Sequence, residues 1–168
     1  EVNWAVEDGA ITADTGPIGL LNTSVPFADY ELLCDFNLAD GGNSGIFLRT
    51  LPPPMKVATD CYELNIAQMH PEGFTTGSIV GHIATEAASA SADDWHTFRV
   101  ICEGPRIQVE LDGPPILDYT GPNSSRASGY IGLQKNAGRV AFRNVLLRPL
   151  GLTPLFNGSD LTDWREVP

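Results

Sequence analysis

Alternation of apolar and polar residues, in short runs separated by glycine and proline, is the feature of this sequence that most restricts its fold. The run DYELLCDFNL places Tyr30, Leu32, Cys34 and Phe36 on one face, and GIFLR and CYELNIA alternate in the same way. A period of two is that of a β-strand with one buried face. About a dozen such runs follow one another, with no convincing amphipathic helix between them. We therefore predict an all-β, antiparallel two-sheet jelly-roll sandwich.

Turn signals support this prediction along the whole chain. Asp8-Gly9 separates WAVE from AITA, as expected for a hairpin. The runs WHTFRVICEG, RIQVELDG and ILDYTG are joined by turns at Gly104-Pro105 and Gly113-Pro114, which predicts three consecutive strands. Residues 84–94 are too polar for a core helix, and we expect a short helical turn or a loop there.

Length and charge limit the classes of function. A chain of 168 residues suits one domain, which we place at 1–150, with a separate segment at 151–168. The net charge is −11 and the ten lysines and arginines are scattered, which excludes nucleic acid and anionic membranes as partners. No stretch is apolar enough to span a membrane. An acidic surface is compatible with a neutral sugar or a cation as ligand.

The cysteines leave the cellular compartment open. Cys34, Cys61 and Cys102 have no metal-site spacing, and their odd number leaves at least one unpaired within the chain. Cys34 and Cys102 are compatible with a disulfide or with two buried thiols. EVNWAVEDG shows no signal peptide, yet we expect an extracellular or periplasmic protein. Three glycosylation sequons begin at Asn22, Asn123 and Asn157, and they matter only in a eukaryotic secretory route.

The strands on either side of Pro52–Pro54 carry the most distinctive polar residues. If Ile46, Leu48, Leu64 and Ile66 face the core, then Arg49, Glu63 and Asn65 stand together on a second sheet face. A cation, a carboxylate and an amide would then share one surface. The ordinary alternative is a cross-strand ion pair on a solvated sheet, which contributes little to stability.

Several motifs, taken in order, resemble the 3-keto-disaccharide hydrolase family, long catalogued as a domain of unknown function. They are WAVEDGAI, DYELLCDF, GGNSGIFLR, CYELNI, TTGSIVG, DDWHTFRV, RIQVELDG, GYIGLQ and VAFRNVLLRPL. The resemblance covers nearly the whole chain and implies a concanavalin A-like jelly roll. It also implies a sugar-binding concave face and, as in characterised members, cleavage of 3-keto-glycosides.

The resemblance suggests a reaction as well as a fold. Where the family commonly has a glutamine and then an aspartate after the YEL glutamate, this chain has Asn65 and Ala67. Cleavage by two carboxylates would need a second acid near Glu63, so ordinary glycoside hydrolysis is not expected. A 3-keto sugar needs only one base, because its ketone acidifies the hydrogen at C2. We therefore assign Glu63 as the base and Arg49 as its electrostatic partner, which a divalent metal could replace or assist.

Further residues are candidates for substrate contact. We include Asn43, Phe47, Asn65, His82 and Gln134, and we consider His70 as a weaker candidate. Each has an ordinary alternative: His70 lies in a polar loop beside Pro71, His82 suits a structural histidine, and Gln134 could simply bond a neighbouring loop. Trp95 belongs to a strand whose family counterpart is core, so we do not expect it to be a sugar platform.

Two alternatives to an enzyme remain open at this point. The first is a non-catalytic carbohydrate-binding module with the same fold, which the alanine at position 67 favours. The second is a structural or interaction domain of a larger exported protein. PLFNGSDLTDW at the end of the chain resembles the family's opening segment, which suggests a following repeat or a permuted domain. We expect Leu155, Phe156, Leu161 and Trp164 to pack on the sandwich.

Overall fold

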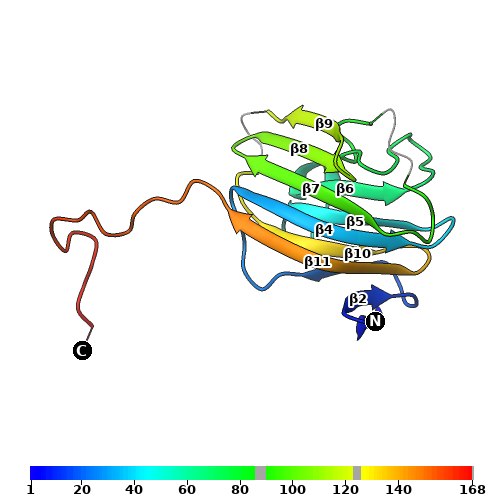
Figure 1. Cartoon of the computed structure of the whole chain (residues 1–168), viewed down its shortest axis with the longest axis horizontal. Helices are drawn as coiled ribbons and strands as arrows, with labels where there is room; N and C mark the ends of the chain where they lie inside the picture. Colours follow the sequence, from blue (N-terminus) through cyan, green and yellow to red (C-terminus); the bar gives the residue numbers. More distant parts are fainter. Residues whose placement is uncertain (86–89, 123–125, 168) are drawn as a thin grey trace.

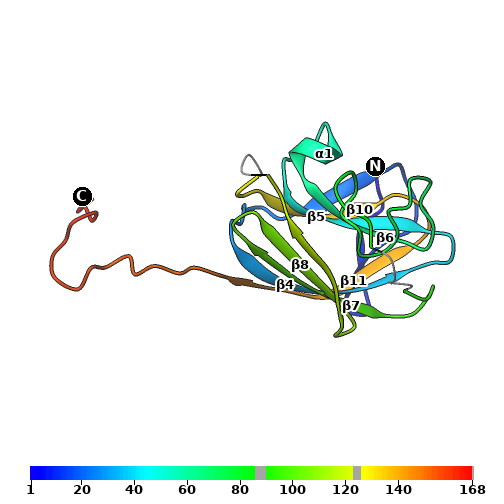
Figure 2. The same cartoon turned by 90° about the horizontal axis from the view of Figure 1, so that it is seen from above.

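A computed structural model describes residues 1–85, 90–122 and 126–167, and within them the chain forms two antiparallel sheets packed face to face (Figures 1 and 2). One sheet has seven strands in the order β1-β2-β11-β4-β7-β8-β9, and the other has four in the order β3-β10-β5-β6. The prediction of an all-β sandwich is confirmed. The predicted turn or loop at 84–94 falls partly on residues outside the described part, and the sequon at Asn123 lies wholly outside it.

The strands follow the alternating runs of the sequence closely. The seven-stranded sheet contains β1 (Ala5–Glu7), β2 (Ala10–Ala13), β4 (Tyr30–Leu38), β7 (His96–Glu103), β8 (Arg106–Leu111), β9 (Pro115–Thr120) and β11 (Val140–Pro149). The four-stranded sheet contains β3 (Gly19–Asn22), β5 (Asn43–Thr50), β6 (Tyr62–Ala67) and β10 (Tyr130–Lys135).

Helix is confined to one short segment of the described chain. α1 (Val57–Asp60) is a single turn that follows the proline break and leads directly into β6. No helix in residues 1–85, 90–122 or 126–167 is long and apolar enough to cross a membrane.

The core lies between the sheets and contains the residues that alternation assigns to the inner faces. Tyr30, Leu32, Cys34, Phe36 and Leu38 of β4 are buried there. Ile46 and Leu48 of β5, with Leu64 and Ile66 of β6, face them from the smaller sheet. The three cysteines are free thiols, and all are buried. The polar residues that alternate with these core residues therefore lie on the outer faces of the two sheets.

The C-terminal tail differs from its prediction. Figure 1 shows the orange and red segment leaving β11 and extending away from the sandwich. Leu155 is 83% exposed and Trp164 is 54% exposed, so these side chains are not packed on the body. This edge of the seven-stranded sheet is formed by the N-terminal strands, since β2 pairs with β11 and β1 pairs with β2. Over residues 151–167, the tail forms local hydrogen bonds, such as that from the Trp164 indole to the Leu155 carbonyl.

Candidate functional site

Glu63 and Asn65 stand on the outer face of the four-stranded sheet, as alternation predicts. Across the β5–β6 ladder, Phe47 lies opposite Glu63 and Gly45 lies opposite Asn65. Their chain neighbours Ile46, Leu64 and Ile66 point to the core instead. The predicted adjacency of the two strands is therefore present, and it brings a carboxylate, an amide and an aromatic ring onto one surface.

β10 and β3 extend this surface on the other side of β5. Gly132 lies opposite both Phe47 and Asn22 in the two ladders, and Gln134 lies two residues further along β10. Alternation places Gln134 on the same face as Gly132. One sheet surface thus collects the side chains of Asn22, Asn43, Phe47, Glu63, Asn65 and Gln134.

Two glycines allow these side chains to lie flat on the sheet. A Cβ atom added to Gly45 would stand 3.2 Å from both Cγ and Oε1 of Glu63, so the Glu63 side chain lies over Gly45. A Cβ atom added to Gly132 would stand 2.7 Å from Oδ1 of Asn22. Glycine within a strand commonly marks such a close approach. We call the group formed by Gly45, Glu63, Asn65, Gln134 and Asn43 the Gly45 site.

Burial controls the ionisation of Glu63. The residue is only 7% exposed. Loss of hydration raises its pKa to about 7, although a hydrogen bond from the Gln134 side chain acts in the opposite direction. No salt bridge to Glu63 is present in the described part of the chain. A raised pKa of this kind suits a group that both accepts and returns a proton near neutral pH.

Buried amide oxygens on the same face lack partners. Gln134 Oε1, Asn43 Oδ1 and Asn22 Oδ1 are each buried and form no hydrogen bond with any residue that the structure describes. Asn65 differs, because its Nδ2 donates to the Phe74 carbonyl. Unpaired buried polar atoms are rare in folded proteins and are costly. A ligand that presents hydroxyl groups to this face would satisfy them.

Arg49 does not share this face, and its predicted placement is corrected. Its φ angle is +50°, and the β5–β10 register shifts between Gly132 and Tyr130. This irregularity turns the side chain away from the position that alternation assigns to it. The guanidinium donates to the carbonyls of Ala28 and Gly104 at 2.9 and 2.6 Å and to Asp29 at 2.8 Å.

Those contacts give Arg49 a structural environment. Asp29 precedes β4 and Gly104 forms the β7–β8 turn, so the side chain links the smaller sheet to the end of the larger one. A third carbonyl, that of Arg126, accepts at 3.0 Å. The residue is almost fully buried. Its donors are therefore committed to the protein itself.

His82 also lies away from the Gly45 site. Its Nδ1 atom is 3.1 Å from the Tyr119 hydroxyl, and its ring packs beside those of Tyr62 and Tyr119. Both tyrosines contact the core cluster, which places His82 at the open end between the sheets. Burial lowers the pKa of His82. His70 instead accepts a hydrogen bond from the Glu72 backbone in its exposed loop.

Sequence reasoning missed Asn22 and the two glycines. Asn22 was noted only as part of a sequon, and its proximity to Gly132 depends on the pairing of β3 with β10. The signal that could have found Gly45 and Gly132 is the presence of glycine inside strongly alternating strands.

The donor set argues against a tightly held transition metal at this face. The Gly45 site offers one carboxylate together with amide oxygens, whereas such metals are usually held by several imidazole, thiolate or carboxylate groups. In the described ranges, no three His, Cys, Asp or Glu side chains gather in a way that could hold a metal ion.

Comparison with known proteins identifies the family. The family model described as 3-keto-alpha-glucoside-1,2-lyase-like domain matches residues 1–148, and the chain therefore belongs to this family. The fold is that of glycosyl hydrolase-like and carbohydrate-binding sandwiches. A comparison with curated proteins finds no match.

Solved structures with this fold include two candidate glycosyl hydrolases from Parabacteroides distasonis. One is 17% identical to this chain with a TM-score of 0.76, and the alignment covers 88% of this chain and 83% of the hydrolase chain. The other is 23% identical with a TM-score of 0.74, over 88% and 90%. The carbohydrate-binding module CBM66 from Bacillus subtilis is 17% identical with a TM-score of 0.69, over 88% and 91%. At these identities the likeness establishes the fold.

Proposed function

We propose that this chain is a carbohydrate-active domain that cleaves 3-keto-glycosides at the Gly45 site, with Glu63 as the group that transfers the proton. The observation that carries the proposal is the buried Glu63 carboxyl, whose pKa is raised to about 7 on an otherwise neutral polar face. A general base is most effective when its pKa lies near the working pH. Membership of the 3-keto-alpha-glucoside-1,2-lyase-like family supports the substrate class.

The reaction uses one carboxylate in two steps. The ketone at C3 acidifies the hydrogen at C2, and ionised Glu63 removes that proton to form an enolate. The enolate electron pair then forms a C1–C2 double bond and expels the glycosidic oxygen from C1. Protonated Glu63 returns its proton to the leaving oxygen, so the products are an unsaturated 3-keto sugar and an alcohol. Elimination of this kind requires no second carboxylate, which agrees with Asn65 and Ala67 on the same strand.

In this proposal, the side-chain amides around Glu63 stabilise the developing negative charge, which is the role that we expected of Arg49 from the sequence. Enolate formation places negative charge on the C3 oxygen, which needs hydrogen-bond donors. The side chains of Gln134 and Asn65 flank Gly45, and each amide carries N–H groups as well as an oxygen. Arg49 acts indirectly in this scheme, by joining the end of β5 to the larger sheet.

Turnover of a 3-keto-α-glucoside tests the proposal directly. Formation of the conjugated product is followed by ultraviolet absorbance for the wild type, for Glu63→Gln and for the matched control Glu103→Gln. Glu103 is exposed at the end of β7. We expect Glu63→Gln to lose at least about 100-fold in kcat while Glu103→Gln keeps full activity. Equal turnover in the wild type and Glu63→Gln would contradict the assignment.

A carbohydrate-binding module is the second candidate, and the unpaired amide oxygens favour it. Gln134 Oε1, Asn43 Oδ1 and Asn22 Oδ1 suit the hydroxyl groups of a sugar whether or not a reaction follows. The sandwich is also similar to CBM66, whose name describes a binding module. Saturable binding of the same glucoside without turnover, with or without added divalent metal, would establish this second function.

A further inference from the structure

A polar groove lies on the face of the molecule opposite Glu63. It has a volume of about 410 Å³ and its floor is formed by the small side chains of Ala10, Thr12 and Ala141. These residues point outward from β2 and β11 of the seven-stranded sheet, since their neighbours Ala13, Val140 and Phe142 belong to the core. We call this hollow the Trp95 groove. It is separated from the Gly45 site by the whole thickness of the sandwich.

An aromatic ring forms one wall of the groove. Trp95 is 37% exposed, and the Arg143 guanidinium carbon lies 3.9 Å from its ring centroid. Arg143 is held in turn by Asp35 at 3.3 Å. The guanidinium lies over one face of the indole and covers it, so only the remaining part of the Trp95 ring is open to the groove. This open part offers a sugar ring an apolar surface next to polar groups.

The loop that carries Trp95 is held rigidly on both sides of the ring. Ser91 donates to Asp94 at 2.7 Å, and His96 bonds Asp112 at 2.7 Å. The Asp93 backbone N–H donates to the Leu38 carbonyl at 2.9 Å, which attaches the loop to the end of β4. A rigid platform loses little entropy on binding, so even a small ligand can be bound measurably.

Unused hydrogen-bonding groups line the rest of the groove. Within the described chain, the side chains of Asp8, Asp93 and Asn37 make no hydrogen bond or ion pair. The remaining charges are balanced, because Arg139 pairs with Glu7 and Arg143 pairs with Asp35. The free groups are thus two carboxylates and an amide. They attract hydroxyl donors and repel anions.

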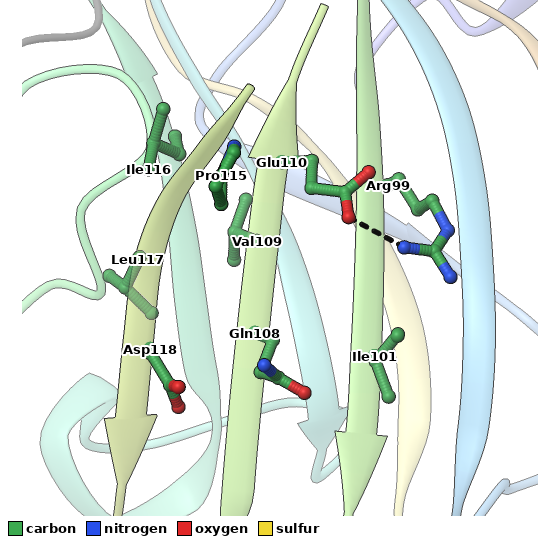
Figure 3. Close-up of a pocket in the computed structure, with 9 residues that line it drawn as sticks. All are labelled: Arg99, Ile101, Gln108, Val109, Glu110, Pro115, Ile116, Leu117 and Asp118. Atoms are coloured by element: carbon green, nitrogen blue, oxygen red, sulfur yellow. Dashed lines mark hydrogen bonds and ion pairs between the residues drawn. The ribbon is translucent and has the colours of Figure 1, made fainter. Parts of the chain in front are cut away.

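Contrary to the expectation from the sequence that Trp95 is not a sugar platform, we propose that the Trp95 groove is a second binding site. Its ligand is a neutral saccharide unit that packs against the open part of the Trp95 ring and donates hydroxyl groups to Asp8 and Asp93. Another hollow on the same sheet lacks this combination of features (Figure 3). There Arg99 points at Glu110 and pairs with it, Asp118 pairs with Arg106, and no aromatic ring lines the hollow. The combination of ring, small-residue floor and free acceptors is present at the Trp95 groove.

Nuclear magnetic resonance can test this proposal on the full chain. The three tryptophans give three indole N–H signals, and Trp95→Phe assigns the relevant one. The probes are the neutral disaccharides cellobiose, maltose, lactose and trehalose, with galacturonic acid as the anionic comparison. We expect saturable shifts of the Trp95 signal and of the Asn37 side-chain amide, with a dissociation constant of about 0.1 to 10 mM.

Variants separate this site from the Gly45 site. Trp95→Ala and Asn37→Ala should each weaken disaccharide binding at least about fivefold, while Glu63→Gln leaves it unchanged. Trp95→Ala should also leave 3-keto-glucoside turnover at the wild-type level. The absence of a saturable shift with every disaccharide up to about 50 mM would overturn the proposal. So would tighter binding of galacturonic acid, or Trp95 shifts that depend on protein concentration alone.

Discussion

At the scale of single residues, Glu63 is the side chain whose environment departs most clearly from that of an ordinary surface carboxylate. It lies on the outer face of a sheet, where solvent would be expected, yet it is buried and without a cationic partner in the described chain. Desolvation raises its pKa, and that shift couples ionisation to stability as well as to the proposed proton transfer.

Stability should therefore fall as Glu63 ionises. The folded-state pKa of about 7 lies above the ordinary value of 4.5, so between these pH values the folded protein binds more protons than the unfolded chain. A raised pKa of this kind reduces stability as pH increases. We expect Glu63→Gln to gain on the order of 2 to 3 kcal/mol relative to the wild type between pH 5 and pH 8.

Urea unfolding of both proteins at several pH values measures this difference. Glu103→Gln provides the control, because it makes the same substitution at an exposed side chain. A free energy of unfolding for Glu63→Gln that runs parallel to the wild type from pH 5 to pH 8 would show that Glu63 is not desolvated.

Gly45 should matter to the site because it leaves room for the Glu63 side chain. In Gly45→Ala the new methyl group would stand 3.2 Å from Glu63 Oε1, so the carboxylate must move. We expect kcat to fall at least about tenfold, with a loss of stability of only about 1 to 2 kcal/mol. Gly19→Ala is the matched control, because its methyl group would meet only the Val2 side chain. Equal losses in kcat for the two variants would show that Gly45 has no special role.

At the scale of elements, the end of β5 shows how one backbone irregularity reassigns a side chain. Regular alternation would place Arg49 beside Phe47 on the outer face. The positive φ at Arg49 and the shifted β10 register instead send the guanidinium to the loop before β4 and to the β7–β8 turn. A residue that appears catalytic by pattern thus joins the two sheets.

Arg49→Lys should accordingly destabilise the fold. A lysine cannot satisfy Ala28, Gly104, Arg126 and Asp29 together, so buried acceptors lose their donors. We expect a loss of about 2 to 4 kcal/mol. Arg106→Lys, which alters the exposed pair with Asp118, should change stability by less than about 0.5 kcal/mol. If Arg49→Lys is as stable as the wild type and yet lacks turnover, then Arg49 takes part in the reaction directly.

At the scale of the whole molecule, the sandwich has two unlike polar faces and a tail that contributes to neither. The Gly45 site and the Trp95 groove lie on opposite sheets, so a ligand at one leaves the other free. The tail extends away from the sandwich (Figure 1), and it exposes the side chains of Leu155, Phe156, Leu161 and Trp164.

Removal of the tail should leave the sandwich intact. A chain truncated after Leu152 retains every strand and the Leu150–Asp29 backbone bond at 2.9 Å. We expect the melting temperature to change by less than about 2 °C, because no core residue is lost. Scanning calorimetry at two protein concentrations measures this. A fall of several degrees, or new aggregation, would indicate that the tail packs on a sandwich in solution.

The sequence alone determined the fold class and the identity of the central carboxylate. Alternation is a local property of the chain, and it decides which side chains of β5 and β6 face the core and which face outward. It therefore predicted the sandwich, the inward Ile46 and Leu64, and the outward Glu63 and Asn65.

Only the tertiary structure decided which residues meet on that face. Asn22 approaches Gly132 because β3 pairs with β10, which lies more than 100 residues further along the chain. Arg49 leaves the outer face because the β5–β10 register shifts, and the alternation of the sequence does not reveal that shift. Likewise, Trp95 lines a groove because β1, β2 and β11 complete the sheet beside it. Long-range pairing and backbone irregularities place side chains in three dimensions, and the local pattern of a strand contains no information about either.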